Sequence, residues 1–144
     1  MSRLSKFWSL TKREKKILCE ASVLLSLSNL CVAAIAFRHV HKLLRILWKD
    51  RIQDDSDHEQ EIKLVRRSIS RAANVLPFKS LCLSRSIAEF AMLRRRGISA
   101  VMFVGARFSG SSGLDAHAWV ETSGGVNNGP DFVTVIRIET GVYK

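Results

Sequence analysis

One stretch, residues 79–97, most constrains what this chain can fold into. It follows Pro77, which disfavours a helical conformation in the residue before it. It closes on Gly97, a residue type favoured just past the end of a helix. We therefore predict a separate helix with Cys82 in its opening turn. The character of the chain changes after Pro77, and the whole sequence predicts an α+β fold: a helical N-terminal region followed by a helix on a small antiparallel sheet.

The first long helix is predicted from a capping box at residues 11–14, so it begins at Lys12. It continues through residues 17–37, which are 21 predominantly apolar residues, and about 20 are enough to cross a bilayer. Glu20 and Asn29 argue against a span, because a carboxylate in lipid costs about 2.5–3.5 kcal/mol. We predict a heavily buried helix of a soluble protein, with a membrane span as the alternative.

Residues 37–49 follow a helical period with an apolar face and a cationic face. The favoured interpretation is a core helix with a solvated outer face. The alternative is a docking face for a partner or for anionic lipid, which would give a peripheral membrane contact. The apolar face holds Phe37, Val40, Leu44 and Leu47, and the cationic face holds Arg38, Lys42, Arg45 and Lys49.

An acidic connector, residues 50–60, separates this segment from the next helix. Residues 56–59 form a second capping box, which predicts a helix starting at about Asp57. That helix must end near Leu76, because Pro77 follows. We divide the chain at this connector into an N-terminal helical region and a core that together form one cooperative unit. The two regions are 1–55 and 56–144.

The residues after Gly97 are rich in valine and phenylalanine and alternate in polarity, which predicts strands. The glycine- and serine-rich segments between them predict a flexible loop and a hairpin turn. The predicted strands are 99–108, 116–122 and 131–139, the loop is 109–113 and the turn is 123–125.

The charge and the cysteine count limit the function classes. The net charge of +10 favours anionic surroundings without choosing among them. The basic residues lie at predicted helix ends and faces, as in the run 94–96, so nucleic-acid binding is not predicted. Three cysteines without a CxxC spacing exclude a disulfide framework and a zinc knuckle, and no cofactor or metal site is predicted. No cleavage site of a secretory signal follows the apolar helix, so we predict a cytoplasmic protein, with membrane association as the alternative.

Cys82 and His117 are the candidate catalytic pair. They lie 35 residues apart, which leaves room for a helix, a strand and a loop to bring them together. A free thiol is only a few per cent thiolate at neutral pH, and a helix N-terminus and a nearby imidazolium both favour the thiolate. A cysteine on a helix followed by a histidine on a strand resembles the arrangement of papain-like and transglutaminase-like enzymes.

A third group should orient the imidazole, and the predicted hairpin leaves two candidates for it. If residues 123–125 form a three-residue loop, Asp131 falls opposite His117. If the loop has two residues, Asn128 falls opposite Trp119 and diagonal to His117. We favour Asp131 because it offers a carboxylate.

Four segments together resemble one family. They are LTKREK at 10–15, VLPFKSLCLSRS at 75–86, LRRRGI at 93–98 and AHAWVE at 116–121. The combination is similar to the transglutaminase-like leader peptidases of bacterial lasso-peptide biosynthesis, in the standalone form. The family usually has an acidic residue soon after the hairpin turn, where this chain has asparagines at 127 and 128.

The resemblance implies a cysteine protease with a Cys–His–Asp site that removes the leader from a ribosomally made precursor. Cys82 would be the nucleophile, His117 the base and acid, and Asp131 the orienting residue. The implied partners are the precursor leader, a separate leader-recognition protein and an ATP-dependent lasso cyclase. The alternatives are a non-catalytic, membrane-associated interaction protein and an enzyme that transfers the acyl group to an amine.

Overall fold

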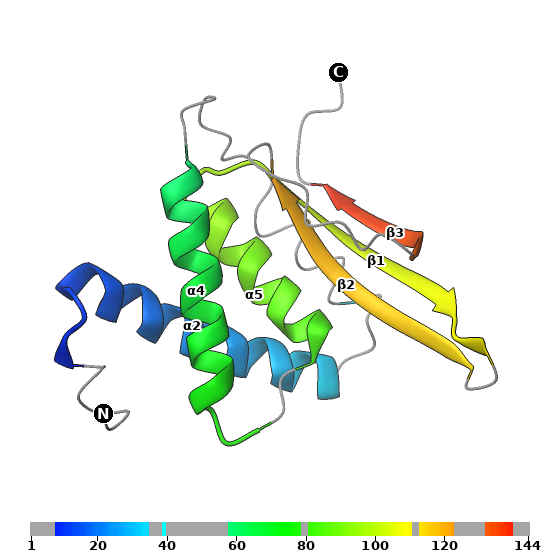
Figure 1. The fold of residues 1–144 in the computed structure, drawn as a ribbon, viewed down its shortest axis with the longest axis horizontal. Coiled ribbons are helices and arrows are strands. Elements are labelled where there is room, and N and C mark those ends of the chain that lie inside the picture. Colours follow the sequence, from blue (N-terminus) through cyan, green and yellow to red (C-terminus); the bar gives the residue numbers. More distant parts are fainter. Residues whose placement is uncertain are drawn as a thin grey trace.

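The computed structural model describes residues 8–34, 39, 58–78, 81–110, 113–122 and 132–139. Within these residues three helices pack beside a three-stranded antiparallel sheet, which confirms the predicted α+β class (Figure 1). Helix α5 lies against strands β1 and β2, and helices α2 and α4 pack on α5 and on each other. The elements are α2 (Lys12–Ala34), α4 (Glu59–Val75), α5 (Cys82–Arg95), β1 (Ala100–Phe108), β2 (Leu114–Thr122) and β3 (Val133–Glu139).

Helix α2 begins at the predicted capping box. The backbone N–H of Thr11 donates to the Glu14 carboxylate at 2.9 Å, and the N–H of Glu14 donates to the Thr11 hydroxyl at 3.2 Å. Each residue therefore satisfies a helix-end donor of the other. The helix buries one face, which carries Ile17, Ala21 and Leu25. Its opposite face is exposed, so the burial is less extensive than the prediction of a heavily buried helix.

Helix α4 starts slightly later than predicted and ends where predicted. Its N-cap is His58, whose side chain makes no capping hydrogen bond, and its first residue is Glu59. Leu76 has an extended backbone with ψ 142° because Pro77 follows it, and the helix ends there. An apolar stripe points into the core at Ile62, Val65, Ile69 and Ala72.

Helix α5 is the centre of the core, since it is covered by the sheet on one side and by two helices on the other. Such a helix is expected to be apolar around much of its circumference. Phe90, Met92 and Leu93 have no accessible surface, and burying a side chain of this size stabilises a fold by about 1.5–3 kcal/mol. The rest of the helical part of the core comes from Ile17, Ala21, Leu25, Ile62, Val65, Ile69, Ala72, Ile87 and Ala88.

The sheet has the order β2-β1-β3, so the predicted pairing of the last two strands is wrong. His117 lies opposite Gly105 and Trp119 opposite Phe103, because β1 and β2 form a hairpin through the loop 109–113. Strand β3 pairs with the other edge of β1. The central position suits β1, since it is the most apolar strand, whereas Val133 and Val135 of β3 are exposed.

The two faces of the sheet differ. Met102, Val104, Val120 and Ile138 point toward the helices and join the core. The alternate residues lie on the other face, as strand geometry requires, and they include Phe103, His117 and Trp119.

Several predictions lie outside the described residues. They are the amphipathic segment 37–49 except His39, the capping residues 56 and 57, the turn 123–125, and the residues 126–131 that include Asn128 and Asp131.

Candidate active site

Cys82 is the first residue of α5, as predicted, and it is exposed. The residue before it, Leu81, is the N-cap, and leucine has no side-chain oxygen that could accept from the first-turn N–H groups. The first helical hydrogen bond runs from the N–H of Arg85 to the carbonyl oxygen of Leu81 at 3.1 Å. The N-terminal turn is therefore not capped by its own N-cap side chain, and it directs its positive end at the thiol.

The thiol of Cys82 meets the strand that carries His117. Its sulfur lies 4.0 Å from the carbonyl oxygen of Ala116, the residue before His117. Strand β2 is an edge strand, so its outer side is open to a helix end. The start of α5 and the histidine-bearing strand therefore meet at this contact.

The imidazole of His117 belongs to a cluster of rings on the face of the sheet away from the helices. We define the aromatic cluster as Phe103, His117, Trp119 and Phe132. The His117 ring stacks on Trp119 with a centroid separation of 6.1 Å and lies 5.3 Å from Phe132. Trp119 also stacks on Phe103 at 5.5 Å. Trp119 and Phe132 both contact the imidazole and each other, and His117 remains half-buried.

Gly105 makes room for this cluster. It is the residue of the central strand directly opposite His117. A Cβ at this position would lie 2.9 Å from the Cβ of Phe132 and 3.0 Å from ring atoms of Trp119. The missing side chain lets Trp119 and Phe132 approach each other across β1, to a centroid separation of 6.5 Å. Glycine in a strand interior often marks such a close approach, so this signal was present in the sequence.

The third catalytic residue is not placed by the described residues, since Asp131 and Asn128 lie outside them. The residue after Asp131, Phe132, contacts the His117 ring. The nearby carboxylate of Asp115 is already engaged: it accepts from Nη2 of Arg107 at 3.1 Å and from Nε at 3.2 Å.

The guanidinium of Arg107 also lies 4.6 Å from the centre of the Phe132 ring. A cation this close to an aromatic face is attracted to it. Arg107 therefore links the Asp115 carboxylate to the edge of the aromatic cluster, a role that the sequence alone did not reveal.

The C-terminal end of α5 is closed by hydrogen bonds. Gly97 has φ 76°, and its N–H donates to the carbonyl oxygen of Arg94. The N–H of Ile98 donates to the carbonyl oxygen of Leu93, and the two hydrogen bonds form a Schellman motif. Arg96 donates to Glu20 of α2 at 2.6 Å and to Glu61 of α4 at 3.1 Å.

The carboxylates around Arg96 change its pKa more than its burial does. Burial alone would lower the pKa of Arg96, but the hydrogen bonds and negative charges of Glu20 and Glu61 raise it. The predicted helix-terminal role of the arginine run is therefore accompanied by a structural one, because Arg96 joins all three helices.

A second ion pair lies nearer to the site. Nε of Arg66 donates to Glu89 of α5 at 2.7 Å, and Nη2 of Arg66 donates to the carbonyl oxygen of Val120 on β2 at 3.2 Å. Burial raises the pKa of Glu89, and the hydrogen bond and charge of Arg66 act in the opposite direction. The pair fixes α4, α5 and β2 relative to one another.

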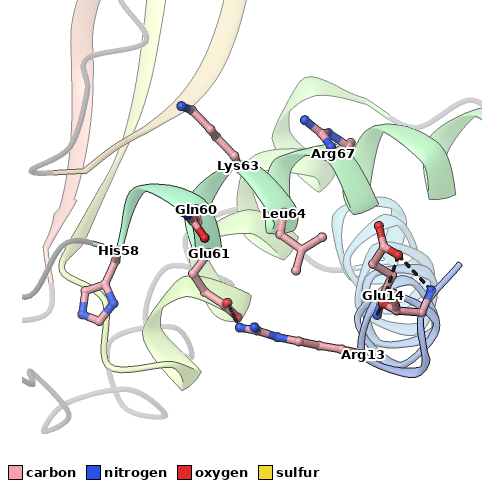
Figure 2. A pocket seen from close by; sticks show the side chains of 9 residues that line it. Arg13, Glu14, His58, Gln60, Glu61, Lys63, Leu64 and Arg67 are labelled. Carbon is pink, nitrogen blue, oxygen red and sulfur yellow. Dashed lines mark hydrogen bonds and ion pairs between the residues drawn. The ribbon is translucent and has the colours of Figure 1, made fainter.

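A surface pocket of ≈600 Å³ lies between the N-terminal ends of α2 and α4 (Figure 2). Arg13 and Glu61 form an ion pair across it. Because Glu61 also binds Arg96 at the C-terminal end of α5, the pocket is remote from Cys82. Among the described residues no group of three or more His, Cys, Asp or Glu side chains is placed to hold a metal ion.

The chain matches a protein-family model, but it matches neither individual curated proteins nor solved structures significantly. A model of the transglutaminase-like superfamily matches residues 24–136, which is well over half of the chain and includes both Cys82 and His117. This superfamily includes cysteine peptidases and transglutaminases, and its fold commonly carries a Cys-His-Asp site. The chain belongs to the transglutaminase-like superfamily.

Proposed function

We propose that the chain is a cysteine peptidase in which Cys82 is the nucleophile and His117 the general base and acid. The observation that carries this proposal is the position of the Cys82 thiol. It is exposed at the N-terminus of α5, where the N-cap offers no side-chain acceptor, and it lies 4.0 Å from the carbonyl oxygen of the residue before His117. Membership of a superfamily that includes cysteine peptidases supports the same assignment.

The proposed reaction has two steps. In the first, the thiolate of Cys82 attacks the carbonyl carbon of the scissile peptide bond, and the imidazolium of His117 gives its proton to the leaving amine. In the second, neutral His117 takes a proton from water, the resulting hydroxide attacks the thioester, and the carboxylic acid leaves while Cys82 returns to its starting state. The N–H of Cys82 at the helix start is the proposed donor to the developing oxyanion.

The proposed substrate is the leader segment of a lasso-peptide precursor. The support for this finer assignment is the resemblance of the segments 75–86 and 116–121 to leader peptidases of that biosynthesis. A separate leader-recognition protein would present the precursor, and an ATP-dependent cyclase would take the released core peptide. A precursor gene and a cyclase gene beside the gene for this chain would support the assignment, and their absence would count against it.

The test is precursor cleavage followed by mass spectrometry, with the recognition partner present. The wild-type chain should release a leader whose mass includes one added water, and Cys82→Ala should release none. Cys19→Ala is the matched control, because Cys19 is also exposed but lies in the middle of α2. Unchanged cleavage by the Cys82→Ala variant would contradict the proposal.

Acyl transfer is the second candidate, because the superfamily also includes transglutaminases. The two reactions share the thioester and differ in the group that resolves it. Adding a primary amine to the assay separates them: hydrolysis leaves the product mass unchanged, whereas transfer adds the mass of the amine with loss of ammonia or of the leaving peptide.

For the third residue we propose Asp131, since its neighbour Phe132 contacts the His117 ring at 5.3 Å. Asp131→Ala should lower the rate of cleavage, and Asn128→Ala should leave it close to wild type. Full activity in Asp131→Ala together with loss of activity in Asn128→Ala would reverse this assignment.

A further inference from the structure

Helix α2 differs from an ordinary surface helix because it exposes apolar residues as well as burying them. Two of its polar residues face the other helices: Glu20 accepts from Arg96 at 2.6 Å, and Asn29 accepts from the hydroxyl of Ser84 on α5 at 3.1 Å. A surface helix normally buries an apolar stripe and exposes its charges. Here apolar residues are also exposed on the side away from α4 and α5.

These exposed residues form one continuous line. We define the α2 stripe as Cys19, Val23, Leu27, Leu30 and Ala34, which follow one another at intervals of three or four residues and therefore share one side of the helix. All five are exposed, with Val23, Leu27 and Leu30 at 58%, 52% and 64% of their full accessibility. The line is about 22 Å long at 1.5 Å per residue. Soluble monomers rarely leave such a contiguous apolar surface uncovered.

The N-terminal end of the α2 stripe is cationic and aromatic. Lys12 and Lys16 continue the same line toward the start of the helix, and both are exposed. Trp8, just before the helix, is 77% exposed, and Nζ of Lys15 lies 5.6 Å from its ring. Tryptophan and lysine beside an apolar helical surface are typical of segments that lie at a membrane–water interface.

We propose that α2 lies in the plane of an anionic membrane surface, with the α2 stripe in contact with the acyl chains and Lys12 and Lys16 at the phosphate groups. The net charge of +10 is complementary to anionic lipid, and the same charge opposes contact between two copies of the chain.

A flat position is favoured over a span by the opposite face of α2. A spanning helix would carry Glu20 into the hydrocarbon together with its partner Arg96, and Arg96 also binds Glu61 of α4. Helix α4 has an exposed charged face that includes Lys63 and Arg67, and this face would have to leave water too. With α2 at the interface, only the α2 stripe leaves water.

The test is flotation of the full chain with vesicles of phosphatidylcholine, with or without phosphatidylglycerol. We expect the chain to float only with the anionic vesicles. The combined change Val23→Ser, Leu27→Ser and Leu30→Ser should weaken binding by about tenfold or more, because three apolar side chains that would contact the acyl chains are lost. The control is Val133→Ser with Val135→Ser, which removes two apolar residues of β3 that are at least as exposed as those of α2 and should leave binding unchanged.

Three further measurements test the role of the charges and distinguish the proposed surface binding from a membrane span and from self-association. Lys12→Gln with Lys16→Gln should weaken binding and reduce its dependence on salt. Alkaline carbonate should release the chain from the vesicles, and resistance to carbonate would overturn the proposal in favour of a span. Sedimentation without lipid should show a monomer, and a dimer abolished by the triple serine variant would overturn it in favour of self-association. Absence of flotation with the anionic vesicles would also overturn it. None of these measurements depends on peptidase activity.

Discussion

The two ends of helix α5 differ in almost every respect. At the C-terminal end, Gly97 closes a Schellman motif and Arg96 binds carboxylates of both other helices. At the N-terminal end, Cys82 is exposed, and the N-cap Leu81 supplies no side-chain hydrogen bond. The same helix therefore has one end at which the backbone is hydrogen-bonded and Arg96 is paired, and one end at which the N-cap side chain accepts from no N–H group. The first end holds the fold together, and the second is suited to chemistry.

This difference predicts that substitutions at the two ends affect different measurements. Changes near Cys82 should alter the rate of catalysis with little effect on the free energy of unfolding. Changes near Arg96 should do the reverse.

The largest effect is expected for Cys82→Ala. Loss of the nucleophile should lower kcat by about 10⁴-fold or more. Because Cys82 is exposed, the free energy of unfolding should change by less than about 0.5 kcal/mol. Precursor cleavage and urea denaturation measure the two quantities. If Cys82→Ala is inactive because it is unfolded, the two ends of α5 do not affect different measurements, and the expectation is contradicted.

Arg96→Met should have the largest effect on stability. It leaves Glu20 and Glu61, each only about one-fifth exposed, without their shared partner. The expected loss is about 2–4 kcal/mol, somewhat below the cost of breaking a fully buried pair. The matched control is Arg95→Met, because Arg95 is 56% exposed and 3.6 Å from Glu20, and its loss should cost less than about 1 kcal/mol. If urea denaturation shows the same loss of unfolding free energy for Arg96→Met and Arg95→Met, the ion pairs of Arg96 do not stabilise the packing of the helices.

Gly105→Ala should affect both measurements, because it disturbs the aromatic cluster from the central strand. The added Cβ would lie 2.9 Å from Phe132 and 3.0 Å from Trp119, so both side chains must shift. The expected cost is about 1–3 kcal/mol, together with a lower kcat as the support of the His117 ring is lost. Gly113→Ala is the control: its φ of 102° makes the backbone strained, but no atom lies within 4 Å of the new Cβ. It should lose stability and keep its activity per folded molecule.

The smallest effect concerns pH. Burial raises the pKa of Glu89 above its ordinary value of 4.5, so the folded chain holds this proton more tightly than the unfolded chain. The stability from this group is fully present below pH 4.5 and is lost as the pH rises through the folded-state pKa. Glu89→Gln should remove this part of the pH dependence while keeping an oxygen that can accept from Arg66. A pH series of urea midpoints that is identical in both proteins would contradict the expectation.

The sequence predicted three helix ends well, because each of these depends on a local signal. The capping box at 11–14, Pro77 and Gly97 all act within a few residues, and the structure has a helix boundary at each. The pairing of the strands was wrong because it depends on contacts far apart in the sequence. The turn-like segment 123–125 suggested a hairpin, but burial of the apolar β1 decided the order by placing it between the other two strands.

For the candidate site too, the features that depend on local sequence could be predicted, and those that depend on strand pairing could not. Cys82 and His117 were predicted as a pair from residue type, spacing and predicted elements, and in the structure the elements that carry them contact each other. The cluster around His117 could not be identified, because Phe132 reaches it only through the pairing of β3 with β1. Because β3 pairs with β1 and not with β2, the register that placed Asp131 opposite His117 does not exist. The proposed role of Asp131 now rests on the contact between its neighbour Phe132 and the His117 ring.

We infer that the N-terminal end of α5 and His117 make Cys82 reactive. The most direct test compares two exposed thiols of the same chain, Cys82 at the helix start and Cys19 in the middle of α2. Iodoacetamide at neutral pH, with the sites separated by peptide mass spectrometry, gives both rates. Cys82 should be modified at least about tenfold faster than Cys19, and His117→Ala should reduce that ratio. Equal rates for the two thiols, or a ratio that His117→Ala leaves unchanged, would contradict the account.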